Sequence, residues 1–168
     1  GVGRRDATGG GAGRGTWDGG GRGGGGRGER GRRGGAVLGE TGNSYHGGTQ
    51  DVADRLGAVG AVEGSRGVRV TRPDPTDFTE RVIDAMATTP AVCAHVHLPA
   101  QSGSNAVLRR MLRRYTREVY LDVVARLRSA IPGITFSTDI IVGFPGETES
   151  QFEETVSLVT AAEFDDAY

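Results

Sequence analysis

Residues 134–148, with the sequence ITFSTDIIVGFPGET, decide the fold class. The continuous apolar run Ile140-Ile141-Val142 predicts a buried strand over residues 134–142, because strands covered on both faces are typical of a parallel sheet. The glycines and proline of residues 143–148 predict a turn. Residues 149–162 then repeat apolar side chains at helical spacing. A buried strand, a short loop and a helix make up most of a βαβ unit.

The same pattern recurs along the chain. Further strands are expected at residues 36–38, 67–71, 92–98 and 164–168. Further helices are expected at residues 49–62, from a cap at Thr76 or Asp77 to Met86, at 105–112, and from a cap at Thr116 to Ile131. The inward side chains of the helix that ends at Ile131 are expected to be Val119, Tyr120, Val123, Val124, Leu127 and Ile131. Those of the helix over residues 149–162 are expected to be Phe152, Val156, Leu158 and Val159. Parallel strands with helical crossovers predict an α/β fold, either a layered sheet or a barrel.

Residues 1–35 have a different composition. They hold 18 of the 30 glycines and eight of the 20 arginines of a chain without lysine. Glycine loses the most backbone entropy on ordering, and only Val2 and Trp17 are large apolar side chains that burial would stabilise. We therefore expect a disordered Gly/Arg-rich segment over residues 1–35 and a folded domain over residues 36–168. An RNA-binding tail of RGG type, a linker and a stretch translated in the wrong frame all fit this composition.

The sequence also argues against several classes of protein. No stretch approaches the roughly 20 apolar residues of a membrane span, and the first residues lack the apolar core of a secretory signal. Cys93 is the single cysteine, so no disulfide and no all-cysteine metal site forms within one chain. We expect a cytoplasmic protein with neither a membrane nor a disulfide partner.

Ligands of such folds bind at the carboxyl ends of the strands, which directs attention to loops 39–48, 72–77, 99–104 and 143–148. In loop 99–104, Gln101 and Ser102 offer an amide and a hydroxyl before a helix, either as a polar, anion-tolerant cup or as an ordinary cap. In loop 143–148, Gly143 and Gly146 allow the backbone to approach a flat ligand. Glu147 is explained by the favourable interaction of negative charge with a helix start.

Three groups of ionisable residues remain open to more than one interpretation. Asp139 either pairs with Arg113 or Arg114 or faces a ligand, because a buried carboxylate needs a partner. His95 and His97 share one strand face with Cys93, where packing and hydrogen bonds are favoured over a metal site. The cluster Arg109, Arg110, Arg113 and Arg114 either holds a carboxylate or RNA phosphates, or is a solvated basic face.

Taken together, several segments closely resemble the radical S-adenosylmethionine (SAM) methylthiotransferases. They are HLPAQSGS (97–104), RRYTRE (113–118), STDIIVGFPGET (137–148), Leu38-Gly39 with Asn43-Ser44-Tyr45, and TRPDPTDF (71–78). Asn-Ser-Tyr and Gln-Ser-Gly-Ser favour the MiaB-type branch, which methylthiolates isopentenyladenosine beside the anticodon of tRNA. The branches that act on a ribosomal protein or on threonylcarbamoyladenosine of tRNA are the alternatives.

The resemblance implies a fold, cofactors and a set of site residues. The fold would be a partial TIM-like (β/α) radical-SAM barrel, and its cofactors SAM and a [4Fe–4S] cluster. Gln101 and Ser102 would lie near the ribose and methionine part of SAM, and Arg113 would meet its carboxylate. The segment from Ile141 through Gly143 to Gly146 would face the adenine, with Asp139 in the same site. The resemblance assigns no catalytic residue in this chain.

One departure from the family pattern limits these expectations. The family carries a Cys-x-x-x-Cys-x-x-Cys motif before Asn-Ser-Tyr, where this chain has its Gly/Arg-rich segment and no cysteine. Without three thiolates the cluster has no anchor, so we expect this chain to be inactive alone. We interpret it as an incomplete core, either a fragment or a copy whose frame is lost before Ala36. The rival interpretation is a non-enzymatic RNA-binding protein with an RGG-like tail.

Overall fold

The computed structural model describes residues 35–37, 51–63, 67–71 and 73–168. The expected disorder of residues 1–35 and the Asn43-Ser44-Tyr45 segment lie outside the described residues, apart from Gly35 in the first strand. So does the whole strand-end loop expected at residues 39–48.

The described strands form one parallel sheet whose spatial order equals the chain order. They are β1 (Gly35–Val37), β2 (Val68–Thr71), β3 (Val92–His97), β4 (Thr135–Thr138) and β5 (Asp166–Ala167). Val70 lies beside Val96, and Val96 beside Phe136, which fixes the register of the three central strands. A sheet that winds in one direction without reversing its order is built like a barrel wall, not like a doubly wound sheet.

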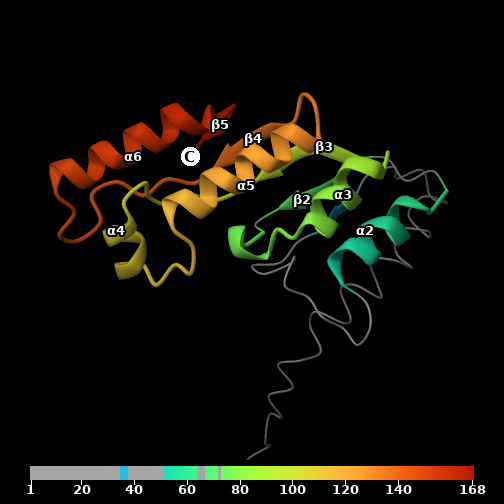
Figure 1. Ribbon diagram of the computed structural model, residues 1–168, viewed down its shortest axis with the longest axis horizontal. Helices are drawn as coiled ribbons and strands as arrows, with labels where there is room; N and C mark the ends of the chain where they lie inside the picture. Colours follow the sequence, from blue (N-terminus) through green and yellow to red (C-terminus); the bar gives the residue numbers. More distant parts are fainter. Residues whose placement is uncertain (1–34, 38–50, 64–66, 72) are drawn as a thin grey trace, which may run out of the picture.

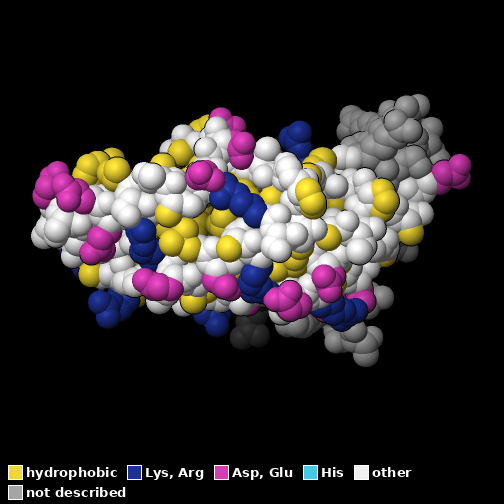
Figure 2. All heavy atoms as spheres, turned by 45° about the horizontal axis from the view of Figure 1, so that its top comes forward, with side chains coloured by type: hydrophobic (Ala, Val, Ile, Leu, Met, Phe, Trp, Pro, Cys, Tyr) yellow, Lys and Arg dark blue, Asp and Glu magenta, His cyan; other side chains and the backbone are white. Residues whose placement is uncertain are grey.

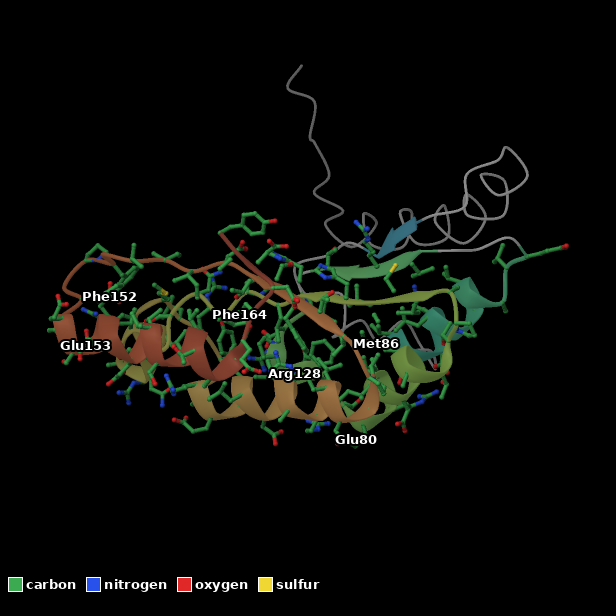
Figure 3. The ribbon with its side chains drawn as sticks, turned by 90° about the horizontal axis from the view of Figure 1, so that it is seen from above. Glu80, Met86, Arg128, Phe152, Glu153 and Phe164 are labelled. Carbon is green, nitrogen blue, oxygen red and sulfur yellow. The ribbon has the colours of Figure 1, made fainter. Side chains whose placement is uncertain are left out.

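The helices cover one face of this sheet, as the view along its edge shows (Figures 1 and 3). They are α2 (Val52–Gly60), α3 (Glu80–Thr88), α4 (Asn105–Arg110), α5 (Arg117–Ala130) and α6 (Glu149–Ala162). α4 is a short helix of six residues between β3 and α5. None of the described helices is long and apolar enough to cross a membrane.

The core lies between the sheet and these helices. Val68, Val70, Val96 and Phe136 are buried on the strands, and Ile83, Tyr120 and Leu127 are buried on α3 and α5. Each fully buried apolar side chain contributes about 1.5–3 kcal/mol relative to an exposed one. The expected inward stripe of α5 is confirmed at Tyr120, Val123, Val124 and Leu127, whereas Val119 is 40% exposed.

The expected strand over residues 134–142 is too long. β4 ends at Thr138, and Ile141 and Val142 are 41% and 61% exposed. The chain leaves the ladder because its next backbone partner is Gln101, which lies in a loop: Ile140 pairs with Gln101 only as an isolated bridge. The apolar run is therefore the start of the strand-end loop, not a strand buried on both faces.

Two predicted helix boundaries are also wrong. Asp74 caps a short 3₁₀ turn at Pro75–Asp77, and the chain then leaves helical geometry at Phe78. α3 begins only after Thr79, whose Oγ1 accepts the Val82 N–H at 3.3 Å. α4 ends at Arg110, before the expected Leu112, which has a left-handed φ of 57°.

α6 has the predicted bounds but a different buried face. Thr155, Leu158 and Ala162 are buried, whereas Phe152 and Val156 are 36% and 49% exposed. The reason is a close approach between the helix and loop 99–104: a Cβ on Gly103 would lie 2.3 Å from the Glu154 carbonyl oxygen. The Thr155 hydroxyl accepts the Gly103 N–H at 2.9 Å. This polar contact turns Thr155 inward.

Candidate functional site

Loop 99–104 and the segment that follows β4 meet at the carboxyl edge of the sheet. The Gln101 N–H donates to the Asp139 carbonyl at 2.8 Å, and the Ile141 N–H donates to the Gln101 carbonyl at 2.8 Å. Gln101 is buried and adopts a left-handed φ of 65°. That conformation costs a residue with a side chain about 1–2 kcal/mol, so the surrounding structure must impose it. Gln101, Asp139 and Ile141 are thus brought together by backbone geometry.

Ser102 lies beneath this junction rather than in the open. Its side chain is 1% exposed, its Oγ accepts the Ser104 N–H at 3.1 Å, and it shares a hydrogen bond with Thr155 Oγ1 at 3.2 Å. The alternative of an ordinary helix cap is not met at Ser104. Ser104 is the N-cap residue of α4, but its side chain makes no cap hydrogen bond. Ser102 therefore shapes the loop from below.

A row of polar side chains runs along β3 and β4 toward the same edge. His95 Nδ1 lies 2.9 Å from Thr135 Oγ1, and His95 Nε2 lies 3.3 Å from Ser137 Oγ. His97 Nδ1 lies 2.9 Å from Ser137 Oγ, and His97 Nε2 lies 3.3 Å from Asp139 Oδ2. The row alternates between the two strands because their registers place His95 and His97 beside Thr135 and Ser137.

This row settles two of the open alternatives. The favoured hydrogen-bonding role of His95 and His97 is confirmed. Asp139 lies beside His97, and among the described residues no ion pair joins it to Arg113 or Arg114, the first of its two alternatives. The strand register brings His97 to the carboxylate, while both arginines are exposed on the α4–α5 loop. Across the described ranges, no three His, Cys, Asp or Glu side chains are grouped to hold a metal ion.

The loop from Gly143 to Glu147 has its own internal support. Glu147 Oε2 accepts the Gly143 N–H at 2.6 Å and the Phe144 N–H at 3.3 Å. Gly143 and Gly146 have φ values of 71° and 76°, which favour glycine. Sequence reasoning assigned Glu147 only to the helix start. The signal that was missed is its position directly after a Gly-x-x-Gly turn, where a carboxylate reaches back to free N–H groups.

Two buried tyrosines hold the segment that leads into loop 99–104. Sequence reasoning did not identify either of them as a support of the site. The Tyr115 hydroxyl donates to the Pro99 and Ala100 carbonyls at 3.1 Å each, and the Tyr120 hydroxyl donates to the Leu98 carbonyl at 2.7 Å. Burial raises the pKa of Tyr115 to about 12, partly opposed by the charge of Arg113. Burial also raises the pKa of Tyr120. Both hydroxyls therefore remain donors at neutral pH.

Arg113 is an exposed residue on the α4–α5 loop, beside a Leu112 side chain that is 88% exposed. No hydrogen bond or ion pair joins it to Gln101, Ser102 or Asp139 within the described part of the chain. On the face shown in Figure 2, basic and acidic side chains are interspersed rather than separated by sign.

The residues present fit one of the two implied cofactors. The strand edge gathers an amide, an imidazole, a carboxylate and one glycine-bounded turn, which suit a ligand with polar amino-acid and flat base parts. A [4Fe–4S] cluster does not fit: the chain has one cysteine, and Cys93 lies on β3. One thiolate cannot supply the three that such a site needs.

The sequence is similar to one protein family and to several curated proteins. The sequence model described as the Radical SAM superfamily matches residues 39–159. A protein of Acidothermus cellulolyticus is 53% identical over 135 residues, which are 79% of this chain and 27% of that protein. A protein of Moorella thermoacetica is 48% identical over 79% of this chain and 30% of its own length. Both are named tRNA-2-methylthio-N(6)-dimethylallyladenosine synthase.

The chain thus spans less than a third of the length of these curated relatives. The matched region contains β2 through most of α6, and with them both strand-end loops. Since the family match covers well over half of the chain, and the sheet winds like a barrel wall, this chain belongs to the radical SAM superfamily of enzymes.

Proposed function

We propose that residues 36–168 are an incomplete core domain of a radical SAM tRNA methylthiotransferase, and that its strand-end loops bind SAM. The substrate of the parent enzyme is isopentenyladenosine beside the anticodon of tRNA, and its compartment the cytoplasm. The names of the relatives support the substrate. The observation that carries the SAM site is the junction of Gln101 with Asp139 and Ile141, which joins the two loops that the family resemblance implies.

Each loop holds a different part of the ligand in this proposal. The Gln101 side chain and the Asp139 carboxylate bind the ribose and methionine part, and Ser102 fixes the backbone beneath them. Ile141, Gly143 and Gly146 form an exposed turn against which the adenine lies. When bound, SAM supplies the methyl group and the 5′-deoxyadenosyl group used in the family's chemistry.

Arg113 reaches this ligand from the α4–α5 loop and pairs with its carboxylate. Its exposure supports this role, because an arginine that makes no ion pair within the described residues is available to a carboxylate.

The donor set supports a second part of the proposal. One cysteine does not anchor the cluster, so the 168-residue chain binds SAM but does not turn it over. Iron and sulfide analysis after anaerobic reconstitution tests this directly. A stoichiometric amount of iron and sulfide would refute it, because Cys93 would then belong to an unexpected cluster site.

The SAM site is tested by equilibrium dialysis of radiolabelled SAM against the 168-residue chain. Gln101→Gly removes the amide side chain and keeps a residue suited to a left-handed φ, so weaker binding reports the side chain and not the backbone. Glu163→Gly is the matched control, because Glu163 also has a left-handed φ, of 46°, at the far end of α6. We expect SAM to bind about tenfold more weakly to Gln101→Gly, because that variant loses one good hydrogen bond to the ligand. We expect Glu163→Gly to bind SAM like the wild type. Equal binding by both variants would remove the Gln101 side chain from the site.

A further inference from the structure

We propose that Arg110, a residue outside the family-like segments quoted above, is a positioning residue for the nucleoside half of SAM. It holds the Gly143–Glu147 loop in its turned conformation from outside the site. This inference rests on the proposed function, because it assumes that this loop receives the adenine.

Arg110 contacts the loop at two points and α6 at a third. Its Nη1 donates to the Pro145 carbonyl at 3.0 Å, and its Nη2 donates to Gln151 Oε1 at 3.3 Å on the first turn of α6. Its guanidinium carbon lies 5.6 Å from the centroid of the Phe144 ring, within the range of a cation–π interaction. Only a planar fork with several donors serves a carbonyl, an amide oxygen and a ring at once. A single side chain of α4 therefore ties the loop to α6.

Gly146 allows this close contact. A Cβ on Gly146 would lie 2.7 Å from Arg110 Nη1, so the guanidinium occupies the space that a side chain would fill. On the other side of the turn, Glu147 Oε2 holds the Gly143 and Phe144 N–H groups. The loop is thus held between a carboxylate within it and a guanidinium from outside. A Cβ on Gly143, by contrast, would meet nothing within 4 Å, so that end of the turn remains open.

This arrangement affects the loop more than the fold. Arg110 is exposed and is not part of the hydrophobic core. Removing it leaves the contacts of α4 with the core intact, because these are made by Val107 and Leu108. Removing Arg110 also releases the turn between Gly143 and Gly146. SAM then has to order this turn when it binds, which lowers the affinity for SAM.

The experiment compares Arg110→Ala with Arg109→Ala in the 168-residue chain. Arg109 is the matched control: it is the preceding residue of α4 and is exposed, and its side chain makes none of the contacts that Arg110 makes with the loop. Three quantities are measured: the urea midpoint, residue-resolved amide hydrogen exchange over residues 143–147, and SAM affinity by dialysis. Arg110→Lys is the conservative variant, which keeps the charge but not the fork.

We expect Arg110→Ala to leave the urea midpoint unchanged, to speed exchange at the Gly143 and Glu147 amides about tenfold, and to weaken SAM binding about tenfold. The Glu147 amide is informative because it donates to the Phe144 carbonyl at 2.8 Å across the turn. Arg110→Lys should recover only part of both effects, and Arg109→Ala should match the wild type.

The outcomes separate this inference from the proposed function. Unchanged exchange in Arg110→Ala, or faster exchange with unchanged SAM affinity, overturns the positioning role and leaves the SAM site standing. A wild-type chain that binds no SAM overturns the proposed function, and the positioning role with it.

Discussion

Gly103→Ala would place a methyl group against backbone atoms of α6. The added Cβ would lie 2.3 Å from the Glu154 carbonyl oxygen and 2.6 Å from the Thr155 Cα. Both are backbone atoms of α6, so no side-chain rotation relieves the contact. α6 or loop 99–104 has to move by about 1 Å to restore ordinary van der Waals separation.

That movement also breaks the hydrogen bond from the Gly103 N–H to Thr155 Oγ1. Overpacking costs about 1–3 kcal/mol and a lost buried hydrogen bond about 1 kcal/mol, so we expect a loss of about 2–4 kcal/mol in the free energy of unfolding. Urea denaturation followed by circular dichroism measures it.

Gly57→Ala is the matched control for the same change of one methyl group. Gly57 lies within α2, and a Cβ there meets nothing within 4 Å. Alanine at such a helical position stabilises by about 0.5–1 kcal/mol. The two substitutions should therefore move the urea midpoint in opposite directions. If the free energy of unfolding of Gly103→Ala were within about 0.5 kcal/mol of the wild type, the close approach of α6 would be refuted. The explanation for the buried face of α6 would fall with it.

Three further predictions concern the side chains of Thr155, Arg81 and Tyr115. Thr155→Val should lower the free energy of unfolding by about 1–3 kcal/mol, because it leaves the buried Gly103 N–H without an acceptor, whereas Thr160→Val on the exposed face of α6 should change it by less than about 0.5 kcal/mol. Arg81→Ala should cost less than about 1 kcal/mol by urea denaturation, because the ion pairs of Arg81 with Asp51 and Asp54 are largely exposed. Stability should fall as pH rises from 10 to 12, by about 1.4 kcal/mol per unit for Tyr115, because its phenol ionises at its ordinary pKa of 10.0 when unfolded but only at about 12 when folded. Urea midpoints at pH 9 and 11.5 should show this loss, and Tyr115→Phe should reduce it.

The sequence was a good guide where local chemistry decides the structure. The sequence predicts the Thr116 cap of α5 and both ends of α6, and the structure shows them at the same residues. Hydroxyl caps and stop signals act within a few residues, so they are visible in the sequence. The parallel α/β arrangement was predicted for the same reason, from the alternation of short apolar runs and helical periods.

Where long-range contacts decide, the predictions failed. Ile141 and Val142 resemble strand residues, but the partner of that segment is a left-handed Gln101, which no local pattern reveals. Phe152 has the apolar character of a core residue, but the close packing of Gly103 turns Thr155 inward instead. The candidate site shows the same division. Its residues remain predictions made one by one from the sequence, while the Asp139 partner depends on strand register and emerged only from the fold.

The polar row on β3 and β4 has a consequence for proton positions. Each hydroxyl in it has one hydrogen to give, and each neutral imidazole has one donor and one acceptor nitrogen. The Thr135 hydroxyl also lies 3.2 Å from the Ala94 carbonyl and donates to it. Thr135 then accepts from His95, Ser137 donates to His95, and His97 donates its Nδ1 proton to Ser137. A neutral His97 in this direction presents a bare Nε2 to the Asp139 carboxylate, and only a second proton on the ring makes that contact attractive. If Thr135 turns its hydrogen to His95 instead, the whole row reverses and a neutral His97 donates to Asp139. The rotation of one hydroxyl at the far end of two strands thus sets which ring nitrogen of His95 and His97 carries the proton in the neutral row.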